Sequence, residues 1–171
     1  PMTLDGVDGT YFAVWAPSAK AVSVIGDFNF WNDKQHRLNV RWDGSGIWEG
    51  FIPDALEGMR YKYKIKSHHN DVVTEKADPY AYSYEHPPNT ASVTATIDGY
   101  KWKDKAWMGY RKDKNDLDKP YSVYEVHLGS WMRNGEDNSF LTYRQLAEKL
   151  VAYVKEMNIT HVEFMPIMEY P

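Results

Sequence analysis

The sequence predicts a β-sandwich in its first hundred residues, followed by a strand–helix–strand unit in its last fifty. Residues 9–98 contain short alternating runs of apolar residues separated by turns, a pattern typical of sandwiches. Residues 141–158 carry apolar residues at helical spacing instead, with a possible strand on each side. The 171 residues are enough for one good core, or for one domain and a fragment of another.

The expected strands of the first part are bounded by turn signals. Pro17 closes the first strand, Gly46 precedes the third, and Gly58 precedes the fourth, which alternates cleanly. A Pro- and Tyr-rich loop covers residues 78–89 before the closing strand. The predicted strands are residues 10–17, 21–28, 47–53, 59–67 and 92–97, with a further short run at 71–75.

The helix predicted over residues 141–158 has a clear start and a clear end. Thr142 followed by Gln145 fits a capping box, in which each side chain satisfies a free backbone N–H group. Asn158 closes the helix, because Asn tolerates the left-handed conformation found at helix ends. One apolar stripe follows from the spacing of Leu146, Leu150, Val154 and Met157.

The runs at 121–131 and 160–171 supply the two flanking strands. The apolar run 162–167 fits a strand of a parallel sheet, so the three elements predict a right-handed βαβ unit. We therefore divide the chain into a module at 1–100, a charged linker at 101–119 and a βαβ segment at 120–171.

Composition excludes several classes of partner. The net charge is -4 with the two signs mixed, which argues against nucleic acid as the main partner. No apolar run approaches membrane-spanning length. The absence of cysteine excludes disulfides and thiolate metal sites and fits a cytoplasmic protein. The adjacent His68 and His69 indicate a turn rather than a metal site, so we expect neither a metal nor a cofactor.

The last fifty residues resemble a known enzyme family. The segments YEVHLGSW (124–131) and THVEFMPIMEYP (160–171) are similar to the first two barrel strands of the 1,4-α-glucan branching enzymes of glycoside hydrolase family 13. The resemblance implies that the βαβ unit begins a (β/α)8 barrel. Asn158 stands where that family is expected to prefer Gly.

The first part resembles the family 48 carbohydrate-binding module that precedes such barrels. The similarity covers nearly all of residues 6–98, and GDFNFWN (26–32) is its most specific piece. KADPYAY (76–82) is typical of the module as it occurs in branching enzymes. It implies an immunoglobulin-like sandwich of the early-set type. By this resemblance, Trp31 stacks on a glucose ring and Lys62 donates to sugar hydroxyls, with Asn89 as a further polar contact. The alternative is that Trp31 only packs its turn and Lys62 is a solvated strand residue.

The sequence lacks two features of a complete enzyme of this family, a second aromatic platform for the sugar and the catalytic carboxylates. The turn at 67–73 lacks the second aromatic platform that the family would have there. In the barrel segment, His127, Trp131 and Glu169 lie at strand ends, where barrel active sites lie, and one interpretation is that they line or support the glucan cleft. The alternative interpretation of His127, Glu169 and Glu125 is a supporting hydrogen-bonding role. The family's catalytic carboxylates come from later barrel strands, so no catalytic residue is assigned.

The resemblance implies that the parent protein is a branching enzyme of glycogen biosynthesis. Such an enzyme cleaves α-1,4 bonds and transfers the chain to a 6-hydroxyl, using a retaining mechanism. The 171-residue chain alone is predicted to be inactive. The alternatives are a stand-alone glucan-binding module and a fragment of a maltooligosyl trehalose trehalohydrolase. The expected partner is an α-glucan, and self-association through the open βαβ segment is a further expectation.

Overall fold

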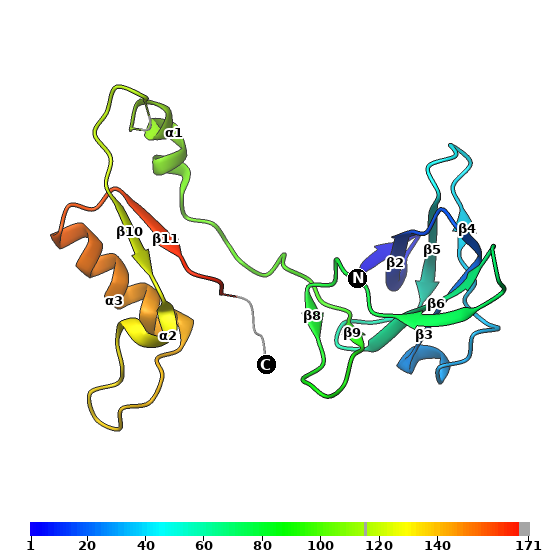
Figure 1. The fold of residues 1–171 in the computed structure, drawn as a ribbon. Coiled ribbons are helices and arrows are strands. Elements are labelled where there is room, and N and C mark those ends of the chain that lie inside the picture. Colours follow the sequence, from blue (N-terminus) through cyan, green and yellow to red (C-terminus); the bar gives the residue numbers. More distant parts are fainter. Residues whose placement is uncertain (115, 168–171) are drawn as a thin grey trace. The chain divides into compact units, whose positions relative to one another are not determined.

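The computed structural model describes residues 1–114 and 116–167. The chain divides into two compact units, Pro1–Lys101 and Trp102–Pro171 (Figure 1). In the described residues the first unit is built mainly from strands, whereas the second combines two strands with three helices.

Two antiparallel sheets make up the first unit. One sheet has the strand order β1-β2-β5-β4, and the other has the order β3-β6-β9-β8 with β7 also paired to β6. The first sheet contains β1 (Met2–Leu4), β2 (Val7–Trp15), β4 (Asn39–Val40) and β5 (Ile47–Pro53). The second contains β3 (Ala19–Gly26), β6 (Arg60–Ser67), β7 (Val73–Lys76), β8 (Ser83–Tyr84) and β9 (Ser92–Val93).

The two sheets share one apolar core. Phe12 of β2 meets the ring of Tyr61 on β6 edge-on, with 4.9 Å between ring centroids, and Tyr63 lies 6.5 Å away. The contact joins residues about fifty positions apart, so it forms only when the sheets pack against each other. The other buried members are Ala19, Val22, Val24, Leu38, Ile52 and Ala55. Alternation along β6 explains this arrangement, because every second residue turns inward.

The observed strands differ from the predicted ones where they are shortest. β1, β4 and β8 contain two or three residues each, too few for alternation to appear in the sequence. The closing strand was predicted over residues 92–97 but covers only Ser92–Val93. Beyond Val93 the chain bonds to the turn before β6 instead of to β6 itself. The backbone N–H of Thr94 donates to the carbonyl of Met59, and its side chain donates to the carbonyl of Leu56 and accepts from the amide of Met59.

The second unit contains a parallel strand pair crossed over by a helix. β10 (Val123–Val126) pairs with β11 (His161–Phe164), and α3 (Tyr143–Glu156) connects them. α1 (Lys105–Lys114) lies inside the segment predicted as a linker, and the short α2 (Leu128–Trp131) follows β10. The unit thus has the βαβ order that was expected over this stretch.

Both ends of α3 agree with their sequence signals. Thr142 and Gln145 form the predicted capping box, in which each side chain accepts a hydrogen bond from the other residue's backbone N–H. Asn158 has φ of 55°, the left-handed conformation expected after the helix. Leu146 and Leu150 are buried, which places the apolar stripe of α3 toward the strand pair.

Candidate functional site

A tight turn after β3 presents Trp31. The helical turn η1 (Asp27–Asn29) is held by the buried Asn29, whose side chain accepts from the amide of Gly26 and donates to the carbonyl of Val24, both at 2.9 Å. The next two residues, Phe30 and Trp31, adopt positive φ angles of 52° and 60°. This conformation is uncommon for bulky residues, so the surrounding hydrogen bonds must hold it.

Trp31 is partly exposed, and hydrogen bonds hold both its backbone and its indole ring. Its backbone N–H donates to the carbonyl of Gly26 at 2.9 Å. Its indole Nε1 donates to Oδ1 of Asp27 at 3.3 Å, and the side chain remains 37% exposed. The ring is therefore oriented by its polar edge, while part of its surface stays open to a ligand.

Asp27 connects this turn to strand β6. Oδ2 of Asp27 accepts from the backbone N and from Nε of Arg60, both at 3.0 Å, and Oδ1 accepts from Nη2 at 2.9 Å. The hydrogen bonds from the Arg60 side chain hold the pKa of Asp27 below its ordinary value. Trp31 is thus linked through one carboxylate to the outer face of β6.

The outer face of β6 carries a row of four cations. Arg60, Lys62, Lys64 and Lys66 alternate with residues that face the core. Arg60 pairs with Asp27 and Glu85, Lys64 with Asp33 and Glu75, and Lys66 with Asp71.

Within the described residues, Lys62 is the exception in this row. Its Nζ donates to the hydroxyl of Thr90 at 2.8 Å rather than to a carboxylate. An ammonium has three N–H donors, so further donors remain for a ligand.

The arrangement suits a neutral polyhydroxy ligand better than an anion. Three of the four cations are already neutralised by carboxylates, which leaves no strong positive field for a phosphate. The oriented indole, which is linked through Asp27 to Arg60, offers an apolar surface, and Lys62 on the strand face that carries Arg60 offers hydrogen-bond donors. The exposed Asn89 adjoins Thr90, so it lies on the side of β6 where Lys62 reaches.

The turn at 67–73 contains no Trp, Tyr or Phe ring on which a sugar could stack. Asp71 accepts from Lys20 at 3.1 Å and contacts Lys66 at 3.2 Å, so ion pairs hold the turn closed.

The sequence did not reveal three residues that organise the β6 surface, namely Asp27, Arg60 and Thr90. Asp27 lies within the GDFNFWN motif, but its partner Arg60 is 33 residues away and carries no local signal.

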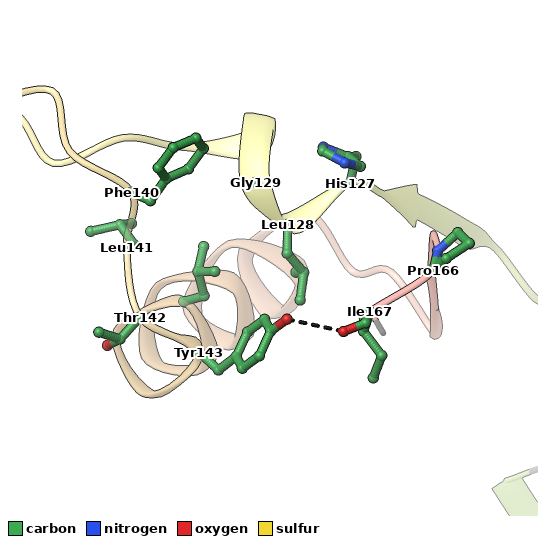
Figure 2. A pocket seen from close by; sticks show the side chains of 10 residues that line it. His127, Leu128, Gly129, Phe140, Leu141, Thr142, Tyr143, Pro166 and Ile167 are labelled. Carbon is green, nitrogen blue, oxygen red and sulfur yellow. Dashed lines mark hydrogen bonds between the residues drawn. The ribbon is translucent and has the colours of Figure 1, made fainter. Parts of the chain in front are cut away.

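The segments after β10 and β11 and the start of α3 line a mostly apolar cavity of about 340 Å³ (Figure 2). His127 and Leu128 lie on one side, and Tyr143 closes another by donating its hydroxyl to the carbonyl of Ile167 at 3.1 Å. His127 shares a hydrogen bond of 2.8 Å with the hydroxyl of Ser130.

Trp131 has a packing role in this unit. It donates its Nε1 to the hydroxyl of Tyr124 at 3.0 Å and contacts the ring of Tyr153. Glu125 and Glu163 lie opposite each other across the strand pair and are exposed. Glu169 lies outside the described residues.

The described residues contain neither a metal-binding cluster nor a membrane-spanning helix. Across residues 1–114 and 116–167, no cluster of three or more His, Asp or Glu side chains is placed to hold a metal ion. None of the helices that the structure describes is long and apolar enough to cross a membrane.

Comparison with known proteins finds a family similar to most of the first unit. Residues 2–81 match the family described as Carbohydrate-binding module 48 (Isoamylase N-terminal domain). The match runs from β1 to the loop after β7, so most of the first unit is similar to this family.

The whole chain is homologous to 1,4-alpha-glucan branching enzymes. It is 52% identical to the enzyme GlgB of Albidiferax ferrireducens over 163 residues, covering 95% of this chain and 26% of that protein. It is 50% identical to GlgB of Rhodospirillum rubrum over 171 residues, covering 100% of this chain and 23% of that protein. The chain thus spans about a quarter of the length of these relatives.

Solved structures share the fold at lower identity. A putative alpha amylase from Salmonella typhimurium is similar with a TM-score of 0.62 and 22% identity, over 94% of this chain and 23% of that one. PulA from Klebsiella oxytoca is similar with a TM-score of 0.64 and 22% identity, over 98% of this chain and 17% of that one.

Proposed function

We propose that this chain is the amino-terminal part of a 1,4-α-glucan branching enzyme and that its first unit binds α-glucan. In this proposal the first unit is an immunoglobulin-like sandwich, and the βαβ unit begins a (β/α)8 barrel. The homology to branching enzymes along the whole chain supports the assignment. The lack of cysteine suits a reducing cytoplasm, where we expect the parent protein to work.

The parent reaction would be a retaining transfer. A carboxylate attacks the anomeric carbon as the α-1,4 bond breaks, and a carboxylic acid protonates the departing oxygen. A 6-hydroxyl of another glucan then attacks the anomeric carbon of the glycosyl-enzyme, which releases the nucleophilic carboxylate. The hydroxyl passes its proton to the second residue, which became a carboxylate when it protonated the departing oxygen. This mechanism rests on family resemblance, and no residue of this chain is assigned to it.

The glucan-binding surface consists of Trp31 and Lys62. The observation that carries it is the hydrogen bond from Lys62 to a hydroxyl, on a strand face where the neighbouring cations contact carboxylates. A lysine with free donors can follow the hydroxyls of a sugar whose C–H face stacks on Trp31. Asn89 is proposed as an additional polar contact beside Thr90.

Affinity electrophoresis in gels with and without glycogen tests this surface. We expect the chain to be retarded by glycogen. Trp31→Ala should weaken binding by about tenfold, the worth of one aromatic contact. Lys62→Ala should weaken it several-fold through lost hydrogen bonds.

Lys64→Ala is the matched control, because Lys64 lies on the same face of β6 but is paired with Asp33 and Glu75. It should migrate like the unmodified chain. Equal retardation of all four proteins would place glycogen binding elsewhere, and no retardation of any would remove the binding function from this unit.

A further inference from the structure

The loop between α2 and α3 carries the single Asn-Gly pair of the sequence, Asn134-Gly135. Asn134 is half-buried, whereas Gly135 is exposed in the turn that follows. The backbone N–H of Asn134 donates to the carbonyl of Ser139, and its carbonyl accepts from the N–H of Asn138, both at 3.0 Å. The loop therefore holds the main chain of Asn134 in place by contacts of its own.

The side-chain amide of Asn134 is folded back along the main chain. The backbone N–H of Glu136 donates to Oδ1 of Asn134 at 3.3 Å. This hydrogen bond closes an Asx turn, a small ring of atoms that includes Cγ of Asn134 and the backbone nitrogen of Gly135. Those two atoms are the ones that join when an asparagine cyclises to a succinimide. The turn thus keeps the two reacting atoms close together.

The hydrogen bond from Glu136 also favours this cyclisation electrostatically. Attack on Cγ of Asn134 moves negative charge onto Oδ1, and an N–H group already aimed at that oxygen stabilises the charge as it develops. The attacking nitrogen must first lose its proton. Within residues 1–114 and 116–167, no hydrogen bond is formed by the Gly135 N–H, so its ionisation breaks no contact.

Gly135 has no side chain to crowd the new bond. A Cβ atom built on Gly135 would meet nothing within 4 Å, and its φ lies outside the left-handed range. The fold therefore does not require glycine at this position. The chemistry is different, because any Cβ would stand next to the nitrogen that attacks.

Asn70 provides an internal comparison, because it has the same kind of turn. The backbone N–H of Val72 donates to Oδ1 of Asn70 at 3.2 Å, as Glu136 does to Asn134. The residue after Asn70 is Asp71, however, whose Cβ and carboxylate lie next to the attacking nitrogen. We therefore expect Asn70 to cyclise more slowly than Asn134.

Asn138 lies in the same loop as Asn134 but lacks a free attacking nitrogen. It is followed by Ser139, whose backbone N–H donates to Oδ1 of Asp137 at 3.0 Å. Loss of that proton would break the hydrogen bond, and the Ser139 side chain adds crowding. Asn134 thus combines three features that favour cyclisation: the Asx turn, a free N–H and a following residue without a side chain.

We propose that Asn134 is a site of spontaneous deamidation. The ionised nitrogen of Gly135 attacks Cγ of Asn134, the bond from Cγ to the side-chain nitrogen breaks, and that nitrogen takes up a proton and leaves as ammonia. Water then opens the succinimide by adding hydroxyl to one ring carbonyl and a proton to the ring nitrogen. The product is an aspartyl or an isoaspartyl residue. Water is the only co-reactant, and the proposal does not depend on glucan binding.

The modification would change both the charge and the main chain of this loop. A new carboxylate would lie beside Glu136 and Asp137, which are already acidic. An isoaspartyl residue also inserts a methylene carbon into the main chain. We therefore expect the isoaspartyl form to lose the backbone hydrogen bonds of Asn134 with Asn138 and Ser139.

Ageing of the 171-residue chain in mildly alkaline buffer, followed by mass spectrometry of tryptic peptides, tests the proposal. Peptide 134–144 contains both Asn134 and Asn138, and peptide 67–76 contains Asn70. We expect the mass change from amide to acid to appear at Asn134 several-fold faster than at Asn70 or Asn138. An isoaspartyl methyltransferase, used as a reagent, should label peptide 134–144. Equal rates at Asn134 and Asn70 would overturn the proposal.

Gly135→Ala is the decisive variant, because the added Cβ fits the fold but crowds the attacking nitrogen. It should slow deamidation at Asn134 several-fold without lowering the free energy of unfolding in urea. Gly99→Ala is the matched control and should leave the rate unchanged, since Gly99 follows no asparagine. An unchanged rate in Gly135→Ala would contradict the proposal. So would a rate in the folded chain far below that of the free peptide 134–144, because the fold would then protect Asn134.

Discussion

Asn29 organises the turn that presents Trp31, although it contacts no expected ligand. It is 2% exposed and bonds to Gly26 and Val24, and its Nδ2 lies 3.0 Å from Nδ1 of His36. A buried amide with this many partners is costly to replace, because each partner would lose its bond. The GDFNFWN motif therefore contains both Asn29, which holds the turn, and Trp31, the candidate sugar-binding residue.

Asp27 makes the stability of the first unit depend on pH. Its pKa is lowered from an ordinary 3.8 by hydrogen bonds from Arg60, so it binds protons less readily in the folded chain than in the unfolded chain. Its contribution is fully present above pH 4 and is lost as pH falls through the lowered value. We expect Asp27→Asn to cost about 1 kcal/mol at pH 7.

Urea unfolding followed by tryptophan fluorescence at pH 7 and at pH 3 measures this effect. The difference in unfolding free energy between the unmodified chain and Asp27→Asn should shrink on acidification. A difference that stays constant with pH would show that the Asp27–Arg60 contact contributes nothing through charge.

At the scale of elements, the end of β3 depends on close contact with β6. A Cβ atom at Gly26 would lie 2.4 Å from the carbonyl oxygen of Arg60 and 2.8 Å from the ring of Phe28. Gly26 has an extended backbone, with φ of -178°, so the restriction is one of space. The glycine therefore sets how closely the Trp31 turn follows the strand pair.

Gly26→Ala should destabilise the first unit by about 1–3 kcal/mol, since backbone must move to admit the methyl group. It should also weaken glycogen binding, because the carbonyl of Gly26 accepts from the amide of Trp31. Urea unfolding and affinity electrophoresis measure the two effects. Gly99→Ala is the control, as a Cβ there meets nothing within 4 Å. Equal stability of the two variants would contradict the proposed close contact.

At the scale of the whole molecule, the βαβ unit has one covered face and one open face. Tyr124 contacts Tyr153 of α3, and Val126 is 3% exposed, so this side of β10 faces the helix. Val123 on the opposite side is 51% exposed. A parallel sheet normally has both faces covered, and unpaired strand edges invite further pairing.

We expect the 171-residue chain to self-associate through this open strand pair. Size-exclusion chromatography with light scattering, over a hundredfold range of protein concentration, measures the mass. The mass should rise with concentration, and Val123→Lys should reduce the rise by placing a charge on the open face. A monomer at every concentration would contradict this prediction.

The isolated chain should have no branching activity, because retaining enzymes need two carboxylates about 5 Å apart and none of its residues is assigned to such a pair. Incubation with amylose followed by iodine staining measures the activity. The full-length Rhodospirillum rubrum relative is the positive control. A stain change with the purified, sequence-verified chain would show that catalytic groups are present.

The sequence by itself determined the β-rich first part, the limits of α3 and the resemblance to branching enzymes. These depend on residues close together in the chain, such as the capping pair Thr142 and Gln145 or the GDFNFWN turn. Only the tertiary structure decided which β6 cations are neutralised and how the two sheets pack. The physical reason is distance along the chain: the contacts of Arg60 with Asp27 and of Tyr63 with Ala13 join positions 33 and 50 residues apart. No local pattern encodes such pairs, because the first forms only when β3 pairs with β6 within one sheet, and the second only when the two sheets pack together.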